Sequence, residues 1–203
     1  QLDAQKRRFE GLAALNARYD TTAMFHTHSY FNGIGGMVWD MWMLMKDLDP
    51  RHIGINFDIG HVMAKAGAGW REAARIARPY VHALSTKDFI WERHADAAPG
   101  EWPWYTRFVR HGDGMVDYEG CFRYFQSTGF EGPIIPYFEY VVDVPGAVLP
   151  FNMNGGPYGK WTLAIPEKTF RAFMKRDVAL HRQALRNVGY AQENQAKPDR
   201  GDA

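Results

Sequence analysis

The sequence predicts an α/β protein of the (β/α)8 TIM-barrel type, with only about four β/α units present. Apolar runs alternate with segments of helical periodicity, each run ends in polar side chains, and the pattern recurs along the chain. The four strand ends are Phe25-His26-Thr27-His28, Phe57-Asp58-Ile59-Gly60-His61, Ser85-Thr86-Lys87-Asp88 and Tyr137-Phe138-Glu139-Tyr140. Parallel barrels build their sites from the carboxyl ends of several strands, so these side chains are expected to meet.

Length and composition fit part of such a barrel. The chain has 203 residues, of which 46% are hydrophobic and 23% charged, which is enough to bury a sizeable core. A complete barrel typically needs about 250 residues. Roughly half a barrel is therefore absent from the sequence, and we expect a single domain over residues 1–190 with a flexible tail over 191–203.

Charge and cysteine content restrict the partners. The formal net charge is +1 and the arginines are scattered, which argues against a nucleic-acid partner. A single cysteine, Cys121, excludes an intramolecular disulfide. No long apolar stretch indicates a membrane helix or a signal peptide, so we expect a cytoplasmic protein with no membrane partner. Because the chain starts with Gln1 rather than Met, we also expect an upstream segment, and export stays open.

The elements of the first half follow from periodicity and from proline. The expected order is a helix over 2–18, a strand over 22–27, a helix around 38–48, a strand over 53–57, a helix over 70–77 and a strand over 80–86. The third of these helices stops before Arg78-Pro79, because proline disfavours helical geometry in the residue that precedes it.

The second half contains two long loops. They are expected over 89–115, where length suggests a functional excursion, and over 141–165, which is rich in Gly and Pro. Between them, Asp117 can cap a helix that ends at Gly129, and a fourth strand is predicted over 133–139. Pro166 is suited to the first position of a last helix that runs to Asn187.

Six short motifs resemble the sugar phosphate isomerase/epimerase family, whose members fold as xylose isomerase-like TIM barrels. The motifs are His26-Thr27-His28-Ser29, Phe57-Asp58-Ile59-Gly60-His61, Lys87-Asp88-Phe89 with Trp91, Gly112-Asp113-Gly114-Met115-Val116-Asp117, Gly129-Phe130-Glu131-Gly132-Pro133 and Phe138-Glu139-Tyr140. They keep the family's order and spacing from about residue 20 to residue 140. The resemblance implies strands five to eight, the carboxyl-terminal half of the barrel.

The resemblance also implies a divalent metal ion (Mn, Mg, Co or Zn), held by a Glu, an Asp, a His and a second Glu from the last four strands. Asp58 matches the Asp and Glu139 the last Glu. His26 stands where many members have the first Glu, and Ser85 where they have the His. His82 lies three residues earlier and should point the opposite way. The expected metal ligands are therefore His26, Asp58 and Glu139, since imidazole also binds such ions.

The implied reaction is the isomerisation or epimerisation of a sugar or sugar derivative. Removing a proton next to a carbonyl creates an enediolate, which a metal stabilises while a carboxylate moves the proton. Glu139 is the expected base, and His26 or His28 the second base. His61 resembles the family's substrate-contacting histidine, and Lys87 could bind an oxygen or a phosphate group. The further candidates for substrate contacts are His28, Trp91 and Arg110.

Each candidate has a simpler structural interpretation. His26 and His28 could be a hydrogen-bonded pair at a strand end. Asp58 could only cap the turn before a helix, and Lys87-Asp88 could be a solvated surface dipeptide. Glu139 is the strongest candidate, because a carboxylate at the end of a buried parallel strand is costly unless it is paired or liganded.

Two other functions stay open. A His-X-His strand end also begins the site of amidohydrolase barrels, although that order continues with Lys, His, His and Asp instead of Asp, Lys and Glu. Alternatively, the chain is a non-catalytic sugar-binding relative whose metal site is degraded at His26 and Ser85. The expected partner is a small-molecule sugar or polyol. An upstream barrel half or a second copy must cover the two open sheet edges, so the isolated chain should self-associate.

Overall fold

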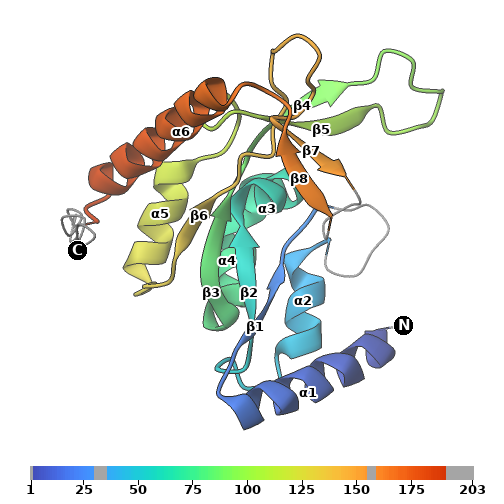
Figure 1. The fold of residues 1–203 in the computed structure, drawn as a ribbon. Helices are drawn as coiled ribbons and strands as arrows, with labels where there is room; N and C mark the ends of the chain where they lie inside the picture. Colours follow the sequence, from blue (N-terminus) through green and yellow to red (C-terminus); the bar gives the residue numbers. More distant parts are fainter. Residues whose placement is uncertain (1, 30–35, 155–158, 191–203) are drawn as a thin grey trace, which may run out of the picture.

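The computed structural model describes residues 2–29, 36–154 and 159–190 and shows a mixed α/β fold around one parallel sheet (Figure 1). This sheet has four strands in the order β1-β2-β3-β6. Their bounds are β1 (Ala23–His26), β2 (Ile53–Asp58), β3 (Val81–Thr86) and β6 (Ile134–Pro136). The predicted fold class is thus confirmed, whereas the expected tail over 191–203 lies outside the described residues.

The helices are α1 (Leu2–Tyr19), α2 (Val38–Met45), α3 (Ile59–Ala66), α4 (Trp70–Ala77), α5 (Tyr118–Ser127) and α6 (Glu167–Asn187), with short 3-10 turns η1 (Gly67–Gly69) and η2 (Arg78–Tyr80). None of the helices over the described residues has the length and apolar character that a membrane crossing requires. Asp117 caps α5 by accepting the N–H of Gly120 at 2.8 Å, and Gly129, with a φ of 68°, follows its end. The cap at Asp117 and the end of the helix near Gly129 were both predicted.

The prediction missed α3, which begins directly after β2. Its residues from Ile59 to Ala64 are all buried, and only His61 and Lys65 are polar among its eight residues, too few for a helical period to stand out from the apolar run of the strand. In the sequence, α3 is therefore hard to distinguish from the end of β2, and the prediction contained only the helix over 70–77.

The core surrounds the two central strands. Every residue of β2 is buried, as expected for a parallel strand with both faces covered. Phe57 of β2 packs edge-on against Phe125 of α5, with ring centroids 5.4 Å apart. At the sheet edge, β6 is shorter than the predicted strand and ends at Pro136, which lacks an N–H. The N–H of Tyr137 still donates to Thr86 at 3.0 Å, so the chain stays alongside β3 beyond the strand.

Both predicted long loops contain antiparallel hairpins, and the prediction is corrected there. One pairs β4 (Asp88–Arg93) with β5 (Trp104–Val109), and the other pairs β7 (Phe151–Asn154) with β8 (Lys160–Leu163). The strands of the first hairpin are mostly half-buried and are joined by ten residues, 94–103, so neither clear alternation nor a two-residue turn marks them in the sequence.

Asp88 fixes the base of the first hairpin. Its carboxylate accepts the backbone N–H groups of Phe89, Gly112, Gly114 and Val116 at 2.8 to 3.1 Å. The residue is only 1% exposed, so the interpretation of Lys87-Asp88 as a solvated surface dipeptide is wrong. The carboxylate instead connects the end of β3 to the turn that leads into α5.

We expect Gly114→Ala to destabilise the fold and Gly11→Ala to stabilise it slightly. A Cβ on Gly114 would collide with the Asp88 carboxylate, and such overpacking typically costs about 1–3 kcal/mol. Gly11 lies in α1 with no atom near its added Cβ, and alanine there should contribute roughly 0.5–1 kcal/mol. Urea unfolding of both variants measures the two changes. Equal stabilities would contradict the role of Asp88.

The open edges of the sheet give a second prediction. In the described chain β1 and β6 each pair on one side only, whereas β2 and β3 pair on both. Amide hydrogens of β1 and β6 should therefore exchange faster than those of β2 and β3 in hydrogen–deuterium exchange. Equal protection of all four strands would show that another chain or segment covers the edges, and sedimentation would then identify self-association.

Candidate active site

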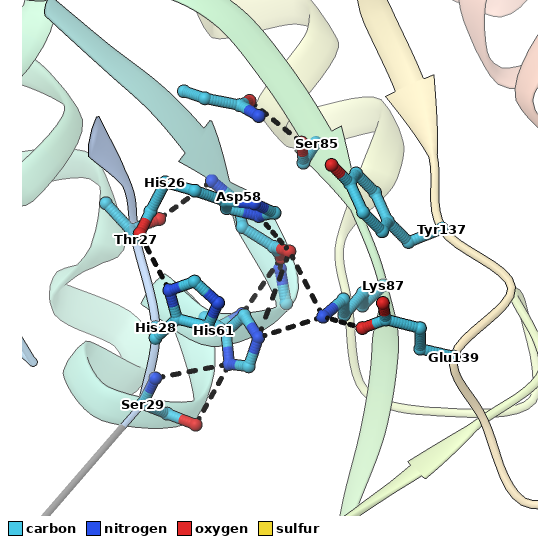
Figure 2. Close-up of polar contacts among 12 residues, drawn as sticks. His26, Thr27, His28, Ser29, Asp58, His61, Ser85, Lys87, Tyr137 and Glu139 are labelled. Atoms are coloured by element: carbon cyan, nitrogen blue, oxygen red, sulfur yellow. Dashed lines mark hydrogen bonds and ion pairs between the residues drawn. The ribbon is translucent and has the colours of Figure 1, made fainter. Parts of the chain in front are cut away.

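The polar side chains from the four strand ends lie together at the carboxyl end of the parallel sheet (Figure 2). His26 ends β1, Asp58 ends β2, Lys87 follows β3 and Glu139 lies beyond β6, while His61 comes from the first turn of α3. The parallel register brings them to one edge, because it aligns β1 with β2, β2 with β3 and β3 with β6 over their last residues. The predicted meeting of the strand ends is what the structure shows.

Asp58 is both a helix cap and the buried centre of the cluster. Its Oδ1 accepts the backbone N–H groups of Gly60 and His61 at 3.0 and 3.2 Å, which caps α3. Its own N–H donates to Thr27 Oγ1 at 2.8 Å. Its Oδ2 lies 3.1 Å from His26 Nε2, which must carry the proton because a carboxylate only accepts. The capping interpretation and the site interpretation are therefore compatible.

The environment of Asp58 favours its charged form. The side chain is fully buried, which by itself raises the pKa of a carboxyl, but the hydrogen bond from His26 and the charge of Lys87 act in the other direction. The net result is a pKa of Asp58 below its usual value. The negative charge of Asp58 therefore lies on the β2 side of the cluster at neutral pH.

Lys87 lies between the two carboxylates. Its Nζ is 2.6 Å from Glu139 Oε2 and 4.0 Å from Asp58 Oδ2. The rings of Tyr137 and Phe108 are 5.2 and 5.5 Å from the same atom, within the range of cation–π attraction. The side chain of Lys87 is only 6% exposed, whereas that of Glu139 is 33% exposed. Glu139 is thus the carboxylate that a substrate can reach.

His61 lies between Lys87 and Ser29. Its Nε2 is 3.2 Å from Lys87 Nζ. On the other side of the ring, Nδ1 accepts the backbone N–H of Ser29 at 3.2 Å, and the Ser29 hydroxyl lies 3.0 Å from the same atom. Burial lowers the pKa of His61 from 6.5 to about 3, in agreement with a neutral ring. Gly60 permits this arrangement, because a Cβ there would meet the backbone of Lys87.

The other predicted residues are only partly brought to this cluster. His28 is part of it, because its Nδ1 donates to the His26 carbonyl at 2.8 Å and its ring centroid is 5.1 Å from that of His61. Trp91 lies on β4 and lines a separate hollow together with Ser29. Arg110 pairs with Asp113 at 3.1 Å, so the structure does not bring it together with the other candidates, and its role as a substrate contact stays a prediction.

As predicted, His82 does not take the place of the histidine that Ser85 replaces. His82 contacts the Pro50 carbonyl at 2.6 Å through its Nε2 and takes no part in the cluster. Ser85 is fully buried and donates to Asn56 Oδ1 at 2.8 Å. The position that the resemblance assigns to a metal-binding histidine therefore carries a hydroxyl that is already engaged.

As they lie, the predicted ligands do not fit a divalent ion. His26 and Asp58 are adjacent, but the ammonium of Lys87 separates Asp58 from Glu139. Over the described parts of the chain, no three His, Cys, Asp or Glu side chains are grouped so that they could hold a metal. The ammonium of Lys87 lies in the space between the two predicted carboxylate ligands.

Four contacts of the cluster were missed. Thr27 and Ser29 lie within the recognised His26-Thr27-His28-Ser29 motif, and only their spacing next to a strand end could have signalled them. Tyr137 opens the recognised fourth strand end. Phe108 had no signal, because it reaches Lys87 and His61 only through the unpredicted hairpin of β4 and β5.

A cavity of about 360 Å³ adjoins the cluster. Its polar lining residues are Thr27, His28, His61 and Lys65, and most of its wall belongs to α2, α3 and α4. The apolar lining residues are Met37, Val38, Trp39, Val62, Ala66, Ala73 and Ile76. A volume of this size can hold a small organic molecule with one polar end against the histidines.

The buried histidines predict acid sensitivity. Between about pH 6.5 and about 3 the unfolded chain binds a proton at His61 that the folded chain does not bind, so stability rises with pH in that window. His181, whose pKa is lowered by burial to about 4, acts in the same direction. Going from pH 7 to pH 5 should cost roughly 2 kcal/mol at His61 alone.

The measurement is urea unfolding at the two pH values, and His61→Gln should lose this part of the pH dependence. His94→Gln is the matched control, because His94 is exposed. An unchanged pH dependence in His61→Gln would contradict the assignment of a neutral His61.

Comparison with known proteins places this geometry in a family. The family model for the xylose isomerase-like TIM barrel matches residues 1–146, which include all four strands of the parallel sheet. No curated protein gives a significant match. The site cluster lies within the matched residues.

Solved structures agree in fold. A xylose isomerase domain protein from Planctomyces limnophilus superposes with a TM-score of 0.58 at 17% identity, covering 90% of this chain and 51% of that one. A D-tagatose 3-epimerase-like protein gives 0.59 at 16%, covering 92% and 55%. A xylose isomerase-like TIM barrel protein from Mycobacterium smegmatis, in complex with magnesium, gives 0.58 at 14%, covering 92% and 51%.

The chain spans about half the length of these structures, and identities this low demonstrate the fold alone. The family model is the stronger finding, because it matches well over half of the chain in sequence. Together with the parallel sheet and its polar carboxyl end, it shows that this chain belongs to the xylose isomerase-like TIM barrel family.

Proposed function

We propose that the chain belongs to a sugar-modifying enzyme, an isomerase or epimerase that moves a proton on carbon next to a carbonyl group. The observation that carries this proposal is the contact of 2.6 Å between the half-exposed carboxylate of Glu139 and the buried ammonium of Lys87. A base and a cation side by side suit a reaction that removes a proton and creates an oxyanion.

The family supplies the substrate class. One of the structures that share this fold is described as D-tagatose 3-epimerase-like, which makes a small sugar, polyol or sugar derivative the substrate class that we infer for this chain. The cavity beside His28 and His61 has the volume for such a molecule. Because fold alone does not determine reaction, the argument for proton transfer rests on the site.

The steps follow from the positions of the groups. Glu139 takes the proton from the carbon, the C–H electron pair forms the carbon–carbon double bond, and the carbonyl electrons move to oxygen. Lys87 donates a hydrogen bond to that oxygen. In an isomerisation Glu139 returns the proton to the former carbonyl carbon, the former carbonyl oxygen gains a proton, and the hydroxyl on the other carbon loses its proton to become the new carbonyl. In an epimerisation Glu139 keeps the proton that it took, and His28, as the second base, delivers a proton to the other face of the same carbon.

Charge is conserved locally during this step. While Glu139 is ionised, its charge offsets that of Lys87. Once Glu139 has gained the proton, the ammonium is left to stabilise the new oxyanion. His61 is a positioning residue here, because its Nε2 lies 3.2 Å from Lys87 Nζ.

Replacing Glu139 by Gln should lower turnover by about 10²- to 10⁴-fold, because the shape is kept and the base is lost. Exchange of the α-proton of a sugar panel with deuterated water, followed by NMR, measures this step directly. Glu131→Gln is the matched control, since Glu131 is exposed and precedes the other end of β6.

The non-catalytic alternative makes the opposite prediction in the same assay. A sugar-binding relative would bind members of the panel without α-proton exchange in the unmodified protein. Binding without exchange would therefore refute the enzyme proposal, whereas exchange that Glu139→Gln abolishes and Glu131→Gln retains would support it.

A further inference from the structure

We infer that the ammonium of Lys87 is the resident cation of this site, in the place that a divalent ion would need, and that the site operates without a metal ion. This inference deepens the proposed function and rests on it only in treating the cluster as the active site. It follows from the atoms that face Lys87 and from the donor atoms that remain for a metal.

The first observation is that most of the carboxylate oxygens already have hydrogen-bond or ion-pair partners. Asp58 Oδ1 already accepts two backbone N–H groups, at 3.0 and 3.2 Å. Asp58 Oδ2 accepts from His26 at 3.1 Å and faces the ammonium at 4.0 Å. Glu139 Oε2 is bound to the same ammonium at 2.6 Å. An ion that contacted both carboxylates would have to displace Lys87.

The second observation is the shape of the space around Nζ. Besides Glu139, it contacts Nε2 of His61 at 3.2 Å and the rings of Phe108 and Tyr137. Aromatic faces attract an ammonium but are not ligands for Mn, Mg or Zn, which take oxygen, nitrogen or sulfur donors. This lining is adapted to an organic cation.

The third observation is the residue opposite Asp58 on β3. Ser85 lies opposite Asp58 in the strand register and is fully buried, and its hydroxyl donates a hydrogen bond to Asn56. The strand therefore offers no charged or imidazole ligand at that position. It contributes a cation two residues later instead.

The decisive measurement is metal binding, which needs no turnover. After treatment with EDTA, the unmodified protein should hold no stoichiometric Mn²⁺ or Zn²⁺ by mass spectrometry and should show only weak, non-stoichiometric binding in calorimetric titration. Lys87→Met, which keeps the stem and removes the charge, should bind one ion more tightly by on the order of 10- to 100-fold. Lys87→Arg keeps the charge and should remain metal-free.

Lys168→Met is the matched control, because Lys168 lies exposed on α6 and its loss should leave metal binding unchanged. Adding Glu139→Gln to Lys87→Met should remove the gained binding, which excludes adventitious binding to other histidines. If Lys87→Met does not fold, the unmodified protein and Lys87→Arg decide alone.

Stoichiometric, tight binding of Mn²⁺ or Zn²⁺ by the unmodified protein would overturn the inference, and so would a folded Lys87→Met that gains no affinity. These outcomes are independent of the proposed function. A protein that binds a metal and exchanges the α-proton would lose only this inference, whereas a metal-free protein without exchange would lose only the proposed function.

Discussion

Burying an ammonium group requires negative charge close to it, and this requirement organises the carboxyl end of the sheet. Lys87 is almost wholly buried after β3, so β2 must supply Asp58 on one side and the segment after β6 must supply Glu139 on the other. Buried charges are costly unless they are paired and hydrogen-bonded. The three strand ends are therefore held by electrostatics where the backbone ladder stops.

Asp58 has two structural roles. One of its oxygens caps α3 and the other faces the site, so the position of the helix and the charge of the site depend on one side chain. His61 lies in the first turn of that helix, and its ring is therefore placed beside Lys87. A change at Asp58 would thus disturb local folding and chemistry together, and the two effects are hard to separate by mutation.

The sequence indicated the parallel strands and their polar ends because apolar runs followed by His26, Asp58, Lys87 and Glu139 are local signals. It could not indicate α3, whose buried residues hide the helical period, nor the two hairpins, whose pairing is between distant residues. Phe108 was missed for that reason. That Arg110 pairs with Asp113, away from the cluster, was not predicted, because charge and proximity to a motif do not reveal the partner of a side chain. Of the predicted metal ligands, His26 and Asp58 are adjacent in space, whereas Lys87 separates Asp58 from Glu139, and this relation depends on side-chain geometry that no pattern contains.

The neighbours Lys87 and Asp88 divide two tasks between opposite sides of the chain. Lys87 turns into the cluster, while Asp88 holds the turn at the base of the first hairpin, and β5 of that hairpin returns Phe108 to cover Lys87. The base of the hairpin is thus anchored independently of its tip over residues 94–103, where Trp102 is largely exposed. Such a tip can change in length and sequence during evolution without disturbing the charges below it, which makes it a natural place for selectivity to diversify among relatives.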